Sequence, residues 1–353
     1  MLNFAVGPVE EFGETLAIGG QRTPYFRTAE FSDVMLESER LMLEFAGAEP
    51  GARAVFLTGS GTAGMEAVVL NVLDAGDRVL VVNGGSFGER FCKICAVHGL
   101  PHGEVRLEAG RQVREGDLAP FDGQGYTALL VNKHETSTGV LYDMELLADF
   151  CRRNGMLLLV DNISSFLADE FDMAALGADV MIAGSQKALA CAPGVSVVAV
   201  GPRALERVAR NRPKTFYLDL RAALADGERG QTPFTPAVGV LLQIHARLKS
   251  IAAAGGAASE VERTRTLAED FRARIRGLPL EVASETPSNA ATPLQPTDGR
   301  SAYGIFEELK AHHGIWVCPN GGALRDRIFR VGHMGALTSA DNAALVFALS
   351  KVF

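Results

Sequence analysis

Two apolar runs, each followed at once by polar residues, constrain the fold of this chain most strongly. Residues 156–160 are continuously apolar rather than alternating, which is typical of a parallel strand buried on both faces. This run ends at Asp161, and a second run over 180–183 leads directly into Gly184-Ser-Gln-Lys187. Open α/β sheets bind their ligands at the carboxyl ends of their strands. We therefore expect Asp161 and Lys187 to meet at one edge of a mostly parallel sheet.

An acid and a lysine on neighbouring strand ends are what pyridoxal phosphate requires. The lysine amine forms a Schiff base with the cofactor's aldehyde, and the acid keeps the ring nitrogen protonated. Of the seven lysines, only Lys133 and Lys187 follow apolar strands directly, and Lys187 has small neighbours that leave room for a cofactor. Poor solvation lowers the pKa of such an amine and makes it nucleophilic. We expect an aminotransferase, in which the freed amine of Lys187 moves the substrate's α-proton.

A glycine-rich segment offers a place for a phosphate. Gly59-Ser-Gly-Thr62 follows a strand expected over 54–58 and opens a helix expected over 65–73. The hydroxyls of Ser60 and Thr62 and the amides at the helix N-terminus can bind a phosphate. The same stretch fits G-x-G-x-x-G, with Asp77 about the right distance on, so a nicotinamide dehydrogenase is a rival. The pattern supports a phosphorylated cofactor in general more than it supports NAD.

Other residues each admit two interpretations. Phe87, after a strand expected over 78–82, either stacks on a flat cofactor or belongs to the core. Arg27 is either a salt-bridged surface residue or a second cation in the substrate pocket. Arg330 either grips a substrate carboxylate as a bidentate pair or forms a structural salt bridge. Cys92 and Cys95 match C-x-x-C but fall within a helix without a second ligand pair, so we expect no metal site.

Length and composition indicate a two-domain globular protein. At 353 residues we expect an N-terminal arm over 1–15, a large cofactor-binding domain over 16–245 and a small domain over 246–353. The net charge of −8 argues against binding to nucleic acid or anionic membranes, and no apolar stretch is long enough to span a bilayer. No signal peptide is recognisable. Five cysteines without framework spacing indicate reduced thiols, and we expect a cytoplasmic protein.

The local patterns predict several further elements. We expect strands over 127–131, 195–200 (antiparallel), 315–318 and 328–333, helices ending near 47 and over 144–154 and 238–253, and irregular chain at 255–256 and 284–298. The polar segment 132–139 follows a strand and is a good active-site loop. His134 within it is interpreted as a hydrogen-bonding or ring-contact residue rather than a metal ligand.

Six motifs in order along the chain resemble class V aminotransferases, and within them the alanine–glyoxylate and 2-aminoethylphosphonate–pyruvate group. These motifs are Gly59–Thr62, His134–Gly139, Asp161–Ser165, Gly184–Lys187, Phe234–Pro236 and Phe329–Gly332. The resemblance implies a fold-type I α/β homodimer, with a mostly parallel seven-stranded sheet, a smaller α/β C-terminal domain and active sites at the subunit interface. It implies amino transfer from a small amino acid or aminophosphonate to pyruvate or glyoxylate.

The resemblance also implies roles for individual residues. Ser60, Gly61 and Thr62 would hold the phosphate, and Thr235 would reach the phosphate bound by the neighbouring subunit. Phe87 would occupy the ring-stacking position, where tryptophan or tyrosine is usual, and Thr136 or Thr138 would contact the ring or its hydroxyl. Gln186 would flank the Schiff base, and Arg330 would bind the substrate carboxylate. The alternative on the same fold is a cysteine desulfurase-like lyase. It would need a mobile cysteine facing the substrate, for which Cys318 is the candidate.

Overall fold

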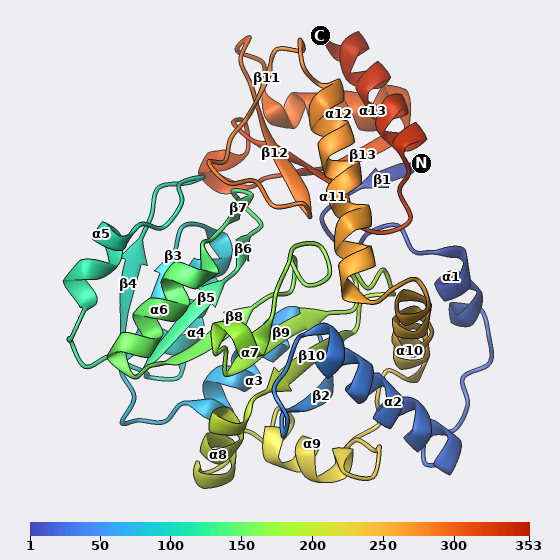
Figure 1. The fold of residues 1–353 in the computed structure, drawn as a ribbon. Coiled ribbons are helices and arrows are strands. Elements are labelled where there is room, and N and C mark those ends of the chain that lie inside the picture. Colours follow the sequence, from blue (N-terminus) through green and yellow to red (C-terminus); the bar gives the residue numbers. More distant parts are fainter.

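The computed structural model describes residues 1–353, and a seven-stranded sheet forms its centre (Figure 1). In spatial order the strands are β2 (Arg53–Thr58), β10 (Val195–Val200), β9 (Val180–Gly184), β8 (Leu157–Asp161), β5 (Ala128–Asn132), β3 (Val79–Asn83) and β4 (His102–Arg106). All pair in parallel except β10, which is antiparallel to both neighbours, as predicted. The predicted strands of this sheet are confirmed to within one residue at each end.

Helices cover both faces of this sheet. Because successive side chains of a strand point to opposite faces, Leu158 and Val160 of β8 enter one apolar cluster and Leu159 enters the other. One face is covered by α3 (Gly61–Val72), α4 (Ser86–Val97), α8 (Pro202–Arg210) and α9 (Leu220–Gly227). The other is covered by α2 (Ala29–Phe45), α6 (Met144–Asn154), α7 (Met173–Leu176) and α10 (Val238–Ala253). The double cover explains the continuously apolar strands.

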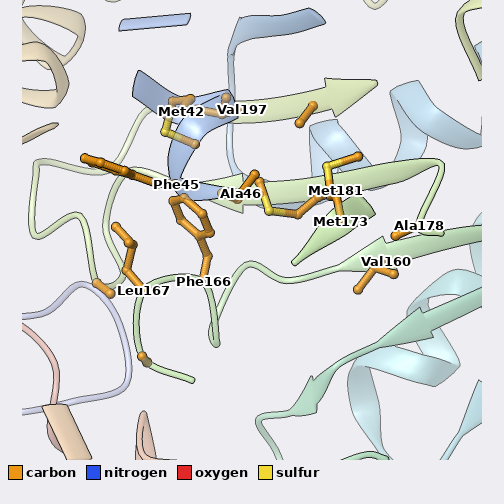
Figure 2. Packing of buried hydrophobic residues seen from close by; sticks show 14 of the residues in the cluster. Met42, Phe45, Ala46, Val160, Phe166, Leu167, Met173, Ala178, Met181 and Val197 are labelled. Carbon is orange, nitrogen blue, oxygen red and sulfur yellow. The ribbon is translucent and has the colours of Figure 1, made fainter. Parts of the chain in front are cut away.

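The apolar cluster on the side of α2, α6, α7 and α10 holds the segment after β8 in place. Figure 2 shows Phe166 and Leu167 of that segment close to Phe45 of α2, with Met181 of β9 nearby. All four side chains are buried. Burying one large apolar side chain contributes about 1.5–3 kcal/mol, so this packing fixes the chain that follows Asp161.

The second sheet has five strands. Their order is β1 (Leu2–Phe4), β13 (Ile315–Pro319), β14 (Phe329–Gly332), β12 (Ala291–Pro296) and β11 (Leu280–Val282), packed with α11 (Ala257–Arg274), α12 (Ala302–His313) and α13 (Ser339–Val352). The N-terminal strand thus pairs with a strand more than three hundred residues later in the chain. The remaining elements are α1 (Gly13–Gly19), α5 (Glu115–Leu118) and the β6 (His134–Glu135) and β7 (Val140–Leu141) hairpin, with short 3-10 turns at Ala119–Phe121 and Gly322–Leu324.

The prediction of an irregular segment over 284–298 is partly wrong, because residues 291–296 form β12, an interior strand of this sheet. Its proline-rich, threonine-rich composition indicated a loop, but β12 pairs with β14 on one side and β11 on the other. Pairing across the sheet outweighs local composition here. The domain limits at 15 and 245 stay a prediction. No helix combines the length and the apolar character needed to cross a membrane.

Candidate active site

Asp161 and Lys187 lie in one cavity of about 190 Å³ at the carboxyl edge of the large sheet. Asp161 ends β8, and Lys187 follows β9, its parallel neighbour. The cavity is lined by Ser60, Gly61, Thr62, Phe87, Arg90, Thr136, Asp161, Ile163, Ser164, Gln186 and Lys187. Sequence reasoning named eight of these and missed Arg90, Ile163 and Ser164. The expectation that the acid and the lysine meet at one sheet edge is confirmed.

Asp161 is a buried carboxylate with few partners of its own. Burial raises its pKa to about 6, and hydrogen bonds from the Ile163 amide (2.8 Å) and the Asn132 side chain oppose that rise. The group is therefore ionised at neutral pH but poorly solvated. A cationic N–H donor placed in the cavity would stabilise it strongly.

Lys187 carries an amine with a lowered pKa. Its pKa is lowered to about 8, mainly by burial and also by repulsion from Arg330 and Arg90, while Cys318 and Asp161 oppose the change. Its Nζ donates a hydrogen bond to the carbonyl of Val6 at 2.6 Å. Near neutral pH a much larger share of this amine is uncharged than in an ordinary lysine, so Lys187 is prepared to act as a nucleophile.

The glycine-rich segment forms the N-terminus of α3, as predicted. Ser60 is the N-cap residue, yet its hydroxyl makes no capping hydrogen bond and stays free for a ligand. A Cβ on Gly61 would come within 2.4 Å of Ile163 Cδ1, so a larger residue there would have to displace the Ile163 side chain. Thr62 Oγ1 accepts a hydrogen bond from Arg90 Nη1 at 2.9 Å. Free amides and hydroxyls at a helix N-terminus are suited to an anion.

Phe87 is held at the start of α4 by a carboxylate from another segment. Glu135 accepts hydrogen bonds from the amides of Phe87 (3.1 Å) and Gly88 (3.0 Å), where the N-cap residue, Gly85, has no side chain to do so. Burial raises the pKa of Glu135, and these bonds oppose the rise. The guanidinium of Arg90 lies 4.6 Å from the centre of the Phe87 ring. The ring is thus fixed at the cavity wall.

Four predicted residues do not line the cavity. Arg330 lies near it on β14 and donates to the carbonyls of Thr136 (3.0 Å) and Pro319 (2.7 Å), with Nε unpartnered. Thr138 is buried and bonds the Glu135 carbonyl. Thr235 is exposed and borders a different, small cavity. Arg27 has no acidic partner and instead holds the loop at 231–233. Their roles stay predictions.

Lys133 occupies a second, larger cavity of about 510 Å³, lined mostly by apolar residues between α6, α7 and α11. Burial lowers its pKa to about 8, and its amine donates to the carbonyls of Asp169 (3.2 Å) and Glu170. Volume alone does not identify which of the two cavities is the active site. The smaller one holds the acid, the lysine and the helix N-terminus together.

The histidine and cysteines adopt the following positions. His134 is buried, its Nδ1 is hydrogen-bonded with Ser164 Oγ at 3.0 Å, and burial lowers its pKa to about 3. Cys92 lies within 4.8 Å of ligand atoms of His102 and Glu104, whereas Cys95 is not in this group. Glu104 already accepts hydrogen bonds from Asn83 and Arg106. All five thiols are free.

The comparison with known proteins decides the family. The profile described as aminotransferase class-V matches residues 9–293. The chain belongs to the class-V aminotransferases. It is therefore a pyridoxal-phosphate-dependent transaminase, which confirms the predicted enzyme class and cofactor. The cofactor is therefore pyridoxal phosphate, and the rival interpretation as a nicotinamide dehydrogenase is not supported.

Relatives and solved structures agree with this family. The small subunit of a soluble hydrogenase from Synechococcus sp. is 34% identical over 84% of this chain and 79% of its own length. The L-aspartate–glyoxylate aminotransferase of Paracoccus denitrificans is 29% identical over 82% and 75%. The crystal structure of an aspartate aminotransferase of subgroup IV from Thermus thermophilus matches with a TM-score of 0.93 and 30% identity, over the full length of both chains.

A further structure bears on the predicted group. The alanine–glyoxylate aminotransferase of Nostoc sp. matches this class-V aminotransferase with a TM-score of 0.93 and 27% identity, over 99% and 94% of the two chains. The predicted fold-type I architecture and the resemblance to the alanine–glyoxylate group are confirmed. The names of these similar proteins differ, so they establish family and fold rather than one substrate.

Proposed function

We propose that this class-V aminotransferase moves an amino group from a small amino acid or aminophosphonate donor to glyoxylate or pyruvate. The observation that carries the proposal is the cavity shared by Asp161 and Lys187. The Paracoccus and Nostoc proteins are both named as glyoxylate aminotransferases, which supports glyoxylate as an acceptor.

The residues around the cavity fit pyridoxal phosphate. Gln186 Oε1 and Arg330 Nε are buried without hydrogen-bond partners, and Ser60 leaves its hydroxyl free, so polar groups await a ligand. When bound, the cofactor supplies an aldehyde carbon for the amine of Lys187 and a ring that takes up the electron pair of the substrate's α-carbon. We propose that Asp161 holds the ring nitrogen, Phe87 stacks on the ring, and Ser60, Gly61 and Thr62 hold the phosphate.

The remaining polar residues at the cavity have positioning roles in this proposal. Thr136 lines the cavity and is hydrogen-bonded to Ser164 Oγ at 2.6 Å, so it is placed to contact the ring's hydroxyl. Thr138 does not line the cavity, and its hydroxyl donates a hydrogen bond to the Glu135 carbonyl. It would act by positioning the loop that carries Thr136. Gln186 borders the position where Lys187 joins the cofactor.

Lys187 and Arg330 perform the steps on the substrate. The Lys187 amine, with its lowered pKa, would take the α-proton from the substrate and deliver it to C4′ of the cofactor. Arg330 has no acidic partner and keeps Nε free, so it is placed to bind the substrate carboxylate. Its two carbonyl hydrogen bonds fix the guanidinium before the substrate arrives. Such preorganisation lowers the cost of binding.

We further propose a cytoplasmic homodimer. Phe216 is 84% exposed and Tyr217 is 50% exposed beside Phe234 and Thr235, an apolar surface suited to a second subunit. Thr235 would then reach the partner's phosphate, and Arg27, by holding the loop at 231–233, would set its position. Free thiols agree with a reducing compartment.

The proposed function is tested with purified protein and a panel of amino donors. We expect transfer to glyoxylate or pyruvate, followed by chromatography of glycine or alanine, and loss of transfer in a Lys187→Ala variant. Sulfide release from cysteine that disappears in a Cys318→Ala variant would instead favour the lyase. Cys318 lies on β13, paired with Arg330, which is a fixed position rather than a mobile loop.

A further inference from the structure

Arg90 is a cation at the cavity wall without an acidic partner. It lies on α4, one turn after Phe87, and is half-buried. Its hydrogen bond from Nη1 to Thr62 Oγ1 leaves the other guanidinium N–H groups free, and no carboxylate forms a salt bridge with it. An unpaired charge out of full contact with water is costly unless a ligand neutralises it.

The charges around the cavity are unbalanced. Arg90 and Lys187 line the cavity and Arg330 lies near it, against the carboxylates of Asp161, which lines it, and of Glu135, whose charge acts on Asp161. The two arginines are held by different segments. Arg330 is bonded to the carbonyls of Thr136 and Pro319, whereas Arg90 is bonded to Thr62 at the N-terminus of α3. A cofactor with a phosphate and a substrate with a carboxylate bring two anions. Arg90 lies beside Ser60–Thr62, the residues proposed for the phosphate, and Arg330 is the residue proposed for the carboxylate.

We propose that Arg90 pairs with the phosphate of the cofactor and thereby sets the preference of this site for the phosphorylated vitamin. This inference rests on the proposed function, because it takes the phosphate to lie at Ser60–Thr62. Thr62 fixes one edge of the guanidinium, and the Phe87 ring supports its face. The free N–H groups then meet the phosphate oxygens in the fork geometry that arginine offers.

The test compares two forms of the ligand. Apoprotein of the wild type, Arg90→Gln and Arg90→Lys is titrated with pyridoxal phosphate and with pyridoxal, and binding is followed by absorbance. Removing a charge-assisted hydrogen bond predicts that the Kd of Arg90→Gln for pyridoxal phosphate rises about 10- to 100-fold, while its Kd for pyridoxal changes less than about 3-fold. Arg90→Lys keeps the charge without the fork and should lie between. Inorganic phosphate should compete with pyridoxal phosphate less effectively in Arg90→Gln than in the wild type.

The control is Arg40→Gln, which removes the same charge from an exposed pair with Glu44 on α2. It should change neither Kd. A parallel loss of affinity for both ligands in Arg90→Gln would overturn the proposal and make Arg90 a support for Phe87. Unchanged affinity for pyridoxal phosphate with a raised KM for acidic donors would assign Arg90 to the substrate instead. Wild-type protein that binds neither ligand would refute the proposed function itself, whatever the variants do.

Discussion

Replacing Gly7 by alanine tests how the N-terminal segment holds the reactive amine. Gly7 has φ +131°, and a Cβ there would lie 2.6 Å from Nζ, 2.7 Å from Cδ and 2.8 Å from Cε of Lys187. Carbon contacts in proteins are favourable at about 3.5–4.0 Å. The methyl group must therefore displace the end of the lysine side chain by about 1 Å, because that end moves more easily than the backbone.

The effects on stability and on function should differ. The left-handed conformation costs an L-residue about 1–2 kcal/mol, and this sets the loss of unfolding free energy. The displaced amine loses its hydrogen bond to the Val6 carbonyl. A misplacement of about 1 Å can cost about 10²-fold in rate, so we expect covalent capture of pyridoxal phosphate to slow by that factor.

The matched control for this prediction is Gly99→Ala. Gly99 also has a left-handed φ of +65°, but a Cβ there would meet nothing within 4 Å. Denaturant unfolding should show similar losses for the two variants, whereas stopped-flow absorbance should show slow capture in Gly7→Ala alone. Equal capture rates in both variants would refute the idea that Gly7 keeps space for the amine.

Three further predictions follow from the charges. Asp161→Asn should still attach the cofactor but lose about 10²-fold or more in single-turnover transamination, because an amide does not keep the ring nitrogen protonated; full activity would contradict this role. The rate of cofactor capture should rise with pH through a midpoint near 8 rather than 10.5, because only the uncharged amine of Lys187 attacks; a midpoint above 10 would exclude the lowered pKa. Arg247 and Glu260 form an ion pair 2.8 Å apart, and both side chains are 6% exposed. Glu260→Gln should lower the free energy of unfolding in denaturant by about 3 kcal/mol, because it leaves the charge of Arg247 buried without its partner. A loss below about 1 kcal/mol would show that the pair is dispensable.

The sequence was sufficient for six of the seven strands of the large sheet and for the reacting pair, whereas β4 at the sheet edge was not predicted. Strands buried on both faces read as continuous apolar runs, so β8 and β9 were visible, and the polar residues after them marked the sheet edge. Two residues missed in the cavity, Ile163 and Ser164, lie two and three positions after Asp161. The signal for Arg90 was its helical spacing from Phe87, since residues three apart share a face.

Other features depend on contacts between distant segments. The Val6 carbonyl meets Lys187 across 181 positions of sequence, and the extended pattern of residues 3–8 fits a surface strand as well as an arm that approaches the active site. The strand β12 was hidden by its prolines and appears only when β14 and β11 are placed beside it. Thr136 and Thr138 share one loop, and the turn geometry of that loop, rather than residue type, brings Thr136 to the cavity.

The most direct test of the account is to locate the covalent bond to the cofactor. Holoenzyme is reduced with borohydride and digested, and the labelled peptide is identified by mass spectrometry. The label should be on Lys187 and absent from a Lys187→Ala variant. Lys133 makes the measurement discriminating, because burial also lowers the pKa of its amine to about 8. A label on Lys133, or on no lysine, would contradict the assignment of the active site.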